Sequence, residues 1–181
     1  MKNHKITVFS KRYKVVLAVT GFLTVAVCLI MNIFIIPMIE STTQGIRCFD
    51  MMSFGYSYET AEKFLCLISD ASLKTYLTVQ LPLDFVYMAV YSVFFIMLIK
   101  LLKKRNTFLF LFPVLLVAAD IAEDIAVTVM LKCDTLSQTV VSVASTATVV
   151  KSFVMYFCFI LIAVLLIKSI IANRKNIRKG E

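Results

Sequence analysis

The chain has 181 residues, of which 60% are hydrophobic, and it contains only four glycines, three prolines and one histidine. This composition is typical of integral membrane proteins and leaves little chain for a separate soluble domain. The net charge of +8 does not indicate a nucleic-acid partner, because the basic residues form short clusters that flank hydrophobic segments. We therefore expect an all-α protein in which residues 1–181 form a single transmembrane domain.

Four segments are long and apolar enough to cross a bilayer, which takes about 20 mostly apolar residues in a helix. They are residues 15–38, 78–99, 107–131 and 138–167. The first follows a basic stretch, but no small-residue cleavage site comes after it, so we interpret it as a retained span rather than a signal peptide. The sequence thus predicts a four-helix transmembrane bundle.

Basic residues are concentrated before the first span, between the second and third spans, and after the fourth. These three clusters hold 14 of the 19 basic residues: Lys2, Lys5, Lys11, Arg12 and Lys14; Lys100, Lys103, Lys104 and Arg105; Lys168, Arg174, Lys175, Arg178 and Lys179. Because positively charged segments stay in the cytoplasm, we expect both the N-terminus and the C-terminus on that side. The clusters also predict affinity for anionic membrane lipid.

The loop between the first two spans, residues 39–77, contains the stretch GYSYETAEKFLCLIS. Ser57 is a candidate helix cap, and Ala61, Phe64, Leu65 and Ile68 fall on one helical face. We therefore expect an amphipathic helix in this outer loop, lying on the membrane surface or covering the mouth of the bundle.

Three carboxylates interrupt the third span, in the stretch VAADIAEDIAVTVML. Helical geometry places Asp120, Glu123 and Asp124 on one arc of about 100°. An ionisable residue at the bilayer centre costs roughly 2.5–3.5 kcal/mol, so a helix face that only had to pack would use serine or glycine. The arc should face the inside of the bundle.

Two other spans carry polar groups that match this arc. The second span has a stripe of Gln80, Asp84, Tyr87 and Tyr91, and the fourth span has Lys151. From the rise of about 1.5 Å per residue, Asp120 and Lys151 come out at the same depth and should pair. Asp84 overlaps in depth with Glu123 and Asp124 in the outer half of the membrane. Four ionised carboxylates and one ammonium would leave a buried charge of −3, which protons, a cation, a basic ligand or water must neutralise.

These buried groups have two interpretations. They could fix the register of the helices, as buried polar groups sometimes do. Four acids near one level exceed what register requires, so we favour a site in an acidic, outward-facing intramembrane pocket that holds a ligand, a cation or a proton. The candidate ligand-binding residues are Asp84, Tyr87, Tyr91, Asp120, Glu123, Asp124 and Lys151.

Parts of the chain between residues 50 and 155 resemble a family of small, uncharacterised bacterial four-span membrane proteins. The matching motifs are G-Y-S/T in the outer loop, Y-L followed by D-x-x-Y at the entry to the second span, D-x-x-E-N in the third and T-x-x-K in the fourth. They fall here on Gly55, Tyr56 and Ser57; Tyr76, Leu77, Asp84 and Tyr87; Asp120 and Glu123; and Thr148 and Lys151. Asp124 stands where the family has asparagine. The resemblance implies the four-span fold, a shared site and a bacterial cytoplasmic membrane, but no particular activity.

Three classes of function remain open. The first is a binding or transport module for a proton, a cation or a small basic molecule, for which a homodimer would be needed in transport because four spans form no evident inverted repeat. The second is a membrane enzyme that uses carboxylates for acid–base chemistry on a lipid-like substrate. The third is an accessory subunit that pairs with another membrane protein. Co-purification with a stoichiometric partner would distinguish the third class.

An enzyme is the less favoured interpretation, and no catalytic residue is assigned. The sequence lacks the motifs of serine hydrolases, zinc peptidases, P-loop enzymes and CDP-alcohol transferases. No cofactor is expected. A metal is not expected either, because no histidine lies in a span and the acids do not have the spacing of a Mg²⁺ or Ca²⁺ site.

Five cysteines occur without a C-x-x-C motif, which argues against a four-span thiol oxidase. Cys28 and Cys158 lie within spans, where a thiol usually acts as a small apolar side chain. Cys48, Cys66 and Cys133 should face the outer compartment, and the sequence does not determine whether any two of them pair.

Overall fold

The structure is a computed structural model that describes residues 10–102, 108–133 and 135–178, with side chains described as far as residue 171. This part of the chain folds into helices and turns without any strand. The elements are α1 (Lys11–Ile30), η1 (Met31–Ile35), α2 (Ile36–Glu40), η2 (Phe49–Met51), α3 (Tyr58–Leu67), α4 (Asp70–Thr75), η3 (Tyr76–Gln80), α5 (Leu81–Leu102), η4 (Phe108–Phe110), α6 (Leu111–Lys132) and α7 (Gln138–Arg178). The all-α fold predicted from the sequence is confirmed for the described residues.

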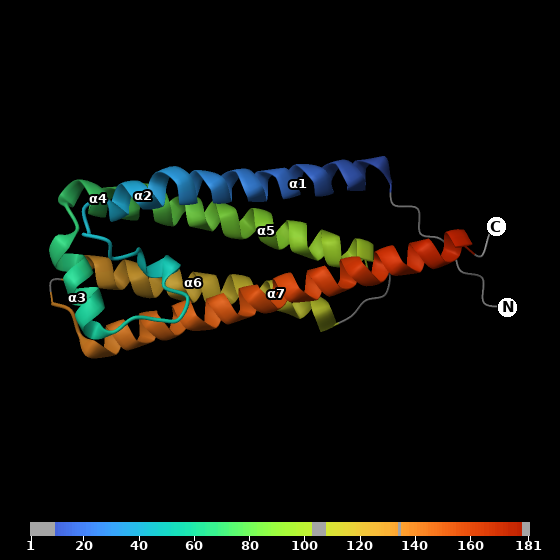
Figure 1. Cartoon of the computed structure of the whole chain (residues 1–181). Helices are drawn as coiled ribbons and strands as arrows, with labels where there is room; N and C mark the ends of the chain where they lie inside the picture. The colour runs from blue at the N-terminus through green and yellow to red at the C-terminus, as the bar shows by residue number, and fades with distance from the viewer. Residues whose placement is uncertain (1–9, 103–107, 134, 179–181) are drawn as a thin grey trace.

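Several of these elements join end to end into long continuous helices, as Figure 1 shows. A π-helical turn, η1, connects α1 to α2, and a second one, η3, connects α4 to α5. Three helices are long and apolar enough to cross a membrane: Lys11–Glu40, Asp70–Leu102 and Gln138–Ile171. They agree with the first, second and fourth predicted spans and extend beyond them, which is consistent with a membrane protein.

The fourth long helix, α6, corresponds to the predicted span 107–131 and differs from the others in composition. Its 22 residues extend over about 33 Å, close to the thickness of a bilayer's hydrocarbon core. All three acids of the predicted arc, Asp120, Glu123 and Asp124, lie inside it and are buried. These charges, rather than a lack of length, set α6 apart from the three apolar helices.

The long helices expose large apolar side chains, as expected of a surface that faces lipid rather than water. Phe22 on α1 is 72% exposed, Phe85 on α5 is 47% exposed, Ile125 on α6 is 57% exposed and Phe153 on α7 is 62% exposed. The helix α6 therefore has an apolar outer face like its neighbours, although its inner face is charged.

The long helices pack side by side, and different parts of the chain lie at the two ends of the bundle. Helix α6 packs along α7, α1 packs along α5, and α5 contacts both α6 and α7. The start of α1, the end of α5, the start of α6 and the end of α7 lie at one end, which we call the basic end (Figure 1). We call the opposite end, which carries residues 41–69, the loop end.

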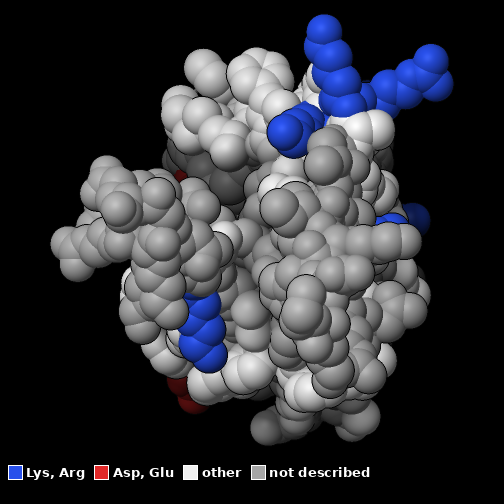
Figure 2. Space-filling view, turned by 90° about the vertical axis from the view of Figure 1, so that its right-hand side faces the viewer, with Lys and Arg blue, Asp and Glu red and all other residues white. Residues whose placement is uncertain are grey.

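Figure 2 looks onto the basic end and shows Lys and Arg side chains at several places around it. The described members of the three predicted basic clusters are Lys11, Arg12, Lys14, Lys100 and Lys168. Lys2, Lys5, Lys103, Lys104, Arg105 and Lys179 lie outside the described residues, and so do the side chains of Arg174, Lys175 and Arg178.

The amphipathic helix predicted in the outer loop is present as α3 and packs against α7 at the loop end. The Ser57 hydroxyl accepts a hydrogen bond from the backbone N–H of Thr60 at 3.2 Å, which caps the first turn as predicted. Ala61 and Phe64 are fully buried. This face of α3 covers the bundle and belongs to an apolar cluster with Phe49 and Tyr76.

Candidate functional site

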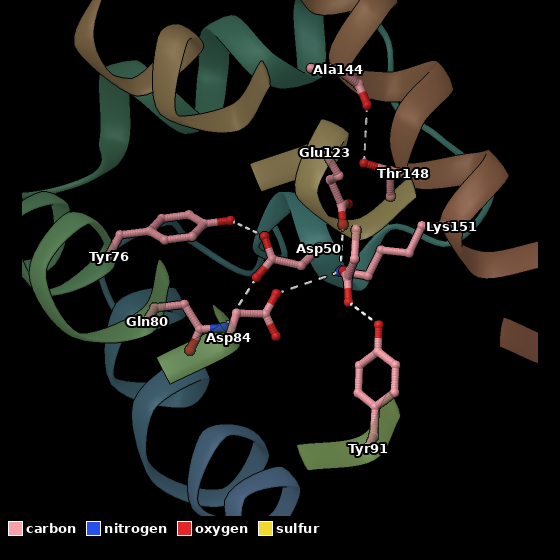
Figure 3. A network of polar contacts seen from close by, with 10 residues as sticks. Asp50, Tyr76, Gln80, Asp84, Tyr91, Glu123, Ala144, Thr148 and Lys151 are labelled. Atoms are coloured by element: carbon pink, nitrogen blue, oxygen red, sulfur yellow. Dashed lines mark hydrogen bonds and ion pairs between the residues drawn. The ribbon is translucent and has the colours of Figure 1, made fainter. Parts of the chain in front are cut away.

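The centre of the candidate site is the ammonium of Lys151, which is 8% exposed on α7. Its Nζ atom lies 2.6 Å from Asp120 Oδ1 and 3.7 Å from Asp84 Oδ2, and it also forms an ion pair with Glu123 Oε2. Figure 3 shows these side chains converging between the helices. The Asp120–Lys151 pair predicted from helical depth is thus present. The one ammonium links α7 to carboxylates from both α5 and α6.

The carboxylates of α6 meet Lys151 because of helical spacing. Asp120, Glu123 and Asp124 are separated by three and four residues, so they share the buried face of α6, as predicted. On α7, Thr148, Lys151 and Ser152 follow the same spacing and are all buried. The two charged or polar faces therefore meet along the contact between α6 and α7.

Further hydrogen bonds extend this network. The Tyr91 hydroxyl donates to Asp120 Oδ2 at 2.7 Å, so both oxygens of Asp120 have partners. The Thr148 hydroxyl donates to the backbone oxygen of Ala144 at 3.2 Å. Thr148 also interacts with the carboxyl group of Glu123, but no donor meets Glu123 Oε1 with hydrogen-bond geometry, although Glu123 is fully buried.

Tyr87 lies close to the site, where the charges of Asp84 and Asp120 act on it, but its closest interactions are with other groups. Its ring packs edge-on against Tyr91, with 5.0 Å between the ring centroids. Its hydroxyl interacts with the thiol of Cys28 on α1. Tyr87 therefore supports Tyr91 and connects α5 to α1, whereas Tyr91 itself binds Asp120.

Asp124 is 1% exposed, and its Oδ2 atom has no hydrogen-bond partner. It contributes to none of the ion pairs of Lys151 found among the described residues. Its charge nevertheless acts on Asp84 and Lys151, so it belongs to the same cluster. Asp124 is thus a buried carboxyl group that interacts with Lys151 electrostatically but forms no ion pair with it within 4 Å.

A fifth carboxylate, Asp50, joins the cluster from the loop end and was not predicted. It lies on the short turn η2, and its two oxygens accept hydrogen bonds from the Tyr76 hydroxyl and from Gln80 Nε2, the latter at 3.1 Å (Figure 3). The neighbouring Phe49 is fully buried and anchors this turn. An aspartate inside the apolar stretch CFDMM was the signal in the sequence that could have identified it.

Phe49 and Gly55 explain how this loop reaches the cluster. The ring of Phe49 packs on Phe64 with 4.5 Å between the centroids, and on Tyr56 with 4.8 Å. Gly55 has a φ of +84°, and a Cβ there would lie 2.7 Å from Ser145 Oγ. The absence of a side chain thus permits close contact between the loop and α7, where the backbone N–H of Tyr56 donates to Ser145 Oγ at 2.8 Å.

Tyr56 lies between the loop and the buried acids. Burial raises the pKa of its hydroxyl, and the charges of Glu123 and Asp50 raise it further. The hydroxyl therefore remains a neutral phenol across the ordinary pH range. It can contribute a dipole to the site but not a charge.

Several cavities lie along the described residues, and no carboxylate lines the ones described next. Two adjoining grooves of about 400 and 460 Å³ lie on the outer surface between α6 and α7, where Ala122 and Val143 line both. A hollow of about 260 Å³ at the loop end is lined by Tyr56, Ser57 and Ser145 among others. The acids themselves are packed closely around Lys151.

The chemistry of the cluster is that of anions around a tethered cation. Among the described residues, no three carboxylate, thiol or imidazole groups are arranged to hold a metal ion. All five cysteines are free thiols, with Cys48 buried and Cys66 and Cys133 exposed. The central position between the carboxylates of Asp84, Asp120 and Glu123 is occupied by Lys151 Nζ.

Comparison with known proteins adds no further constraint, since no protein family, curated protein or solved structure matches the chain.

Proposed function

We propose that the chain is a four-span integral membrane protein that holds protons or a small cation in the carboxylate cluster around Lys151. The observation that carries this proposal is an excess of acid over base. Asp50, Asp84, Asp120, Glu123 and Asp124 interact electrostatically around a single ammonium. Fully ionised, these six groups would have a net charge of −4.

Such a charge is not stable in a low-dielectric interior without compensation. The idealised cost of an isolated buried ion is about tens of kcal/mol, and proteins avoid it by protonation, pairing or ion binding. Lys151 compensates one charge. Glu123 Oε1 and Asp124 Oδ2 receive no hydrogen bond from neighbouring groups. Bound protons or a small cation are therefore the remaining means of compensating the other negative charges.

The close packing of the site favours a small guest over a large one. Lys151 Nζ already occupies the centre, with Asp120 Oδ1 at 2.6 Å. A larger basic ligand would have to displace this ammonium, whereas a proton needs only an accessible carboxylate oxygen. We therefore favour protons first, then small monovalent cations.

Four spans and cytoplasmic termini complete the proposal. The length of α6 and its apolar outer face support its role as the fourth span, and the basic end fits the cytoplasmic side of a bacterial membrane under the positive-inside rule. Cysteines introduced at Gln44 and Ser137 should then react with an impermeant thiol reagent from outside. A cysteine beside Lys104 should react only after permeabilisation, and labelling there in intact cells would contradict this topology.

The test of the function is thermal stability measured across pH and added cations. Purified protein in detergent should lose stability as the pH rises and neutralising protons leave, and sodium or methylammonium should restore part of it. Glu123→Gln and Asp124→Asn each remove one negative charge while they keep the side-chain size. Both variants should respond less to pH and to cations than the unmodified protein.

Glu62→Gln is the matched control, because Glu62 is exposed on α3 at the same end of the molecule. It makes the same chemical change as Glu123→Gln but outside the cluster, and it should respond like the unmodified protein. If all four proteins respond identically, the buried acids serve helix register and the proposal is wrong.

An accessory subunit is the second candidate function, and the groove between α6 and α7 favours it. Small residues such as Ala119, Ala122 and Ala147 line this outward surface, and small residues permit close approach of helices in membranes. A second copy or another membrane protein would then co-purify in stoichiometric amount. The enzyme alternative has less support, because a lipid-like substrate needs a cavity beside the acids and no carboxylate lines the cavities described above.

A further inference from the structure

We infer that Asp50 is the carboxylate through which protons enter and leave the cluster, and that this exchange occurs from the loop end alone. The inference rests on the proposed function and specifies its route.

Asp50 differs from the other four acids in its access. Asp84, Asp120, Glu123 and Asp124 are between 0% and 4% exposed, whereas Asp50 is only partly buried. It lies on η2, a turn of the loop end, rather than on a long helix. Of the five carboxylates, Asp50 is therefore the one that solvent at the loop end can reach.

Asp50 is also coupled to the rest of the cluster. The titratable and charged groups that face it are Tyr76 from η3, Asp84 from α5, Glu123 and Asp124 from α6, Lys151 from α7, and Cys48 and Tyr56 from the adjoining loop. Gln80 Nε2 donates to Asp50 Oδ2 at 3.1 Å, and Figure 3 shows the side chains of Asp50, Gln80 and Asp84 close together. The negative charge of Asp50 also acts on Asp84.

Buried acceptors without donors indicate where an arriving proton would be held. Glu123 Oε1, Asp124 Oδ2 and Gln80 Oε1 have no hydrogen-bond partner, and all three residues are at most 1% exposed. The two carboxylates can each bind a proton covalently. Asp124 makes no ion pair with Lys151, and in Glu123 the oxygen without a donor is Oε1, whereas Oε2 forms the ion pair with Lys151.

The opposite half of the bundle is apolar. Beyond Tyr91 toward the basic end, the buried side chains of α5, α6 and α7 include Phe95, Leu116, Cys158 and Ile162. Among the described residues, no polar side chain is buried before Asp120 in α6 or after Ser152 in α7.

Helix α1 offers no alternative route through that half. The hydroxyls of Thr20 and Thr24 donate to carbonyls of their own helix. Among the side chains that the structure describes, these hydroxyls do not extend the buried polar cluster toward the basic end, so we expect exchange to be confined to the loop end.

The transfer itself is a simple exchange of one proton. A hydronium ion at the loop end gives its proton to a carboxylate oxygen of Asp50 and becomes water. That O–H bond then breaks as a carboxylate oxygen of Asp84 or Glu123 accepts the proton, and Asp50 regains its negative charge. Each cycle raises the net charge of the cluster by one, and no oxidant or reductant is needed.

The experiment is a one-sided pH jump on protein reconstituted in liposomes. Infrared difference spectroscopy follows the band of protonated carboxylic acids, and labelling of the exposed Cys66 from outside identifies vesicles with the loop end outward. An acid jump on that side should raise the band promptly. The same jump at the basic end should raise it at least about tenfold more slowly.

Asp50→Asn keeps the size of the side chain and an oxygen that can accept from Tyr76, but it cannot carry the proton. It should slow uptake at least about tenfold with nearly the same final amplitude. Asp50→Glu should restore most of the rate, which a purely structural role would not require. Asp70→Asn is the control, because Asp70 is an exposed acid at the same end.

The outcomes separate the two proposals. If the unmodified protein shows no uptake, both the proposed function and this inference are wrong. If it takes up protons and Asp50→Asn does so at the same rate, the function stands and the role of Asp50 is wrong. If Asp50→Asn does not fold, equal rates for jumps at the two ends of the unmodified protein would still overturn the one-sided route.

Discussion

Replacement of Lys151 by methionine should be the most destabilising single change in the cluster. Lys151 Nζ contacts three carboxylates, and the most distant of them, Asp84 Oδ2, lies at 3.7 Å. Removing one partner of a buried ion pair costs about 3–5 kcal/mol, because the other charge is left uncompensated. Lys151→Met strands three carboxylates at once, so we expect a loss of at least about 4 kcal/mol.

Asp120→Asn should cost less, about 1–3 kcal/mol. Lys151 retains Asp84 and Glu123 as partners, and the amide oxygen of asparagine can still accept the hydrogen bond from Tyr91. The two single variants should therefore lose different amounts of stability, although each removes one partner of the same 2.6 Å ion pair. An isolated pair would instead give similar losses.

The double variant measures the coupling between the two residues. Once Lys151 is gone, the change of Asp120 to asparagine removes one of the stranded charges, so it should cost little or even stabilise the protein. We expect the double variant to lose about 1–3 kcal/mol less unfolding free energy than the sum of the losses of the two single variants.

The assay is reversible unfolding in mixed micelles of a mild detergent and dodecyl sulfate, followed by circular dichroism. Ser92→Ala is a control on an exposed part of α5 that does not contact the cluster. If the losses of the two single variants add fully in the double variant, Asp120 and Lys151 are energetically independent and our reading of the pair is refuted.

Two further predictions concern the loop end. Gly55→Ala should destabilise the protein by about 1–3 kcal/mol more than Gly45→Ala in the same unfolding assay. Both glycines have a positive φ, but a Cβ would meet Ser145 Oγ at 2.7 Å only at Gly55, and equal losses would contradict the close contact with α7. Burial and two neighbouring carboxylates raise the pKa of the Cys48 thiol, so its contribution to stability is present below about pH 8.5 and is lost as the pH rises further. Maleimide labelling of Cys48 should therefore stay slow at pH values where the exposed Cys133 reacts rapidly.

The features that the sequence predicted correctly are those that helical geometry determines locally. The arc of Asp120, Glu123 and Asp124 follows from a rotation of about 100° per residue, and the depth of Lys151 follows from a rise of about 1.5 Å per residue. The cap at Ser57 is likewise a local pattern of side chain and backbone. None of these features depends on which helices pack against each other. They require only the order and direction in which the spans cross the membrane.

The role of Tyr87 could not be predicted in the same way. Its position on α5 falls within the predicted stripe, close in angle to Tyr91. A tyrosine side chain is long, however, and the neighbouring helix determines what its hydroxyl meets. Here α1 provides Cys28, so the hydroxyl of Tyr87 interacts with a thiol while Tyr91 binds Asp120.

Asp50 could not be placed because its position depends on contacts distant in sequence. The segment around it has no helical periodicity, and its path depends on Phe49 packing against Phe64 and on the approach of Gly55 to Ser145. The backbone N–H of Cys48 donates to Glu40 Oε1 at 2.8 Å, which fixes the start of the turn at the end of α2. Only the folded loop brings this aspartate to Gln80.

Asp124 is the residue that best separates a structural role from a binding role for the cluster. Helix register is already fixed by Lys151, which links α7 to acids on α5 and α6, and by Tyr91, which links α5 to Asp120. Asp124 adds nothing to these contacts, since its buried Oδ2 has no partner. Burial of this carboxyl group costs free energy, and its Oδ2 atom has no hydrogen-bond partner to offset that cost, which supports our proposal that the cluster holds positive charge.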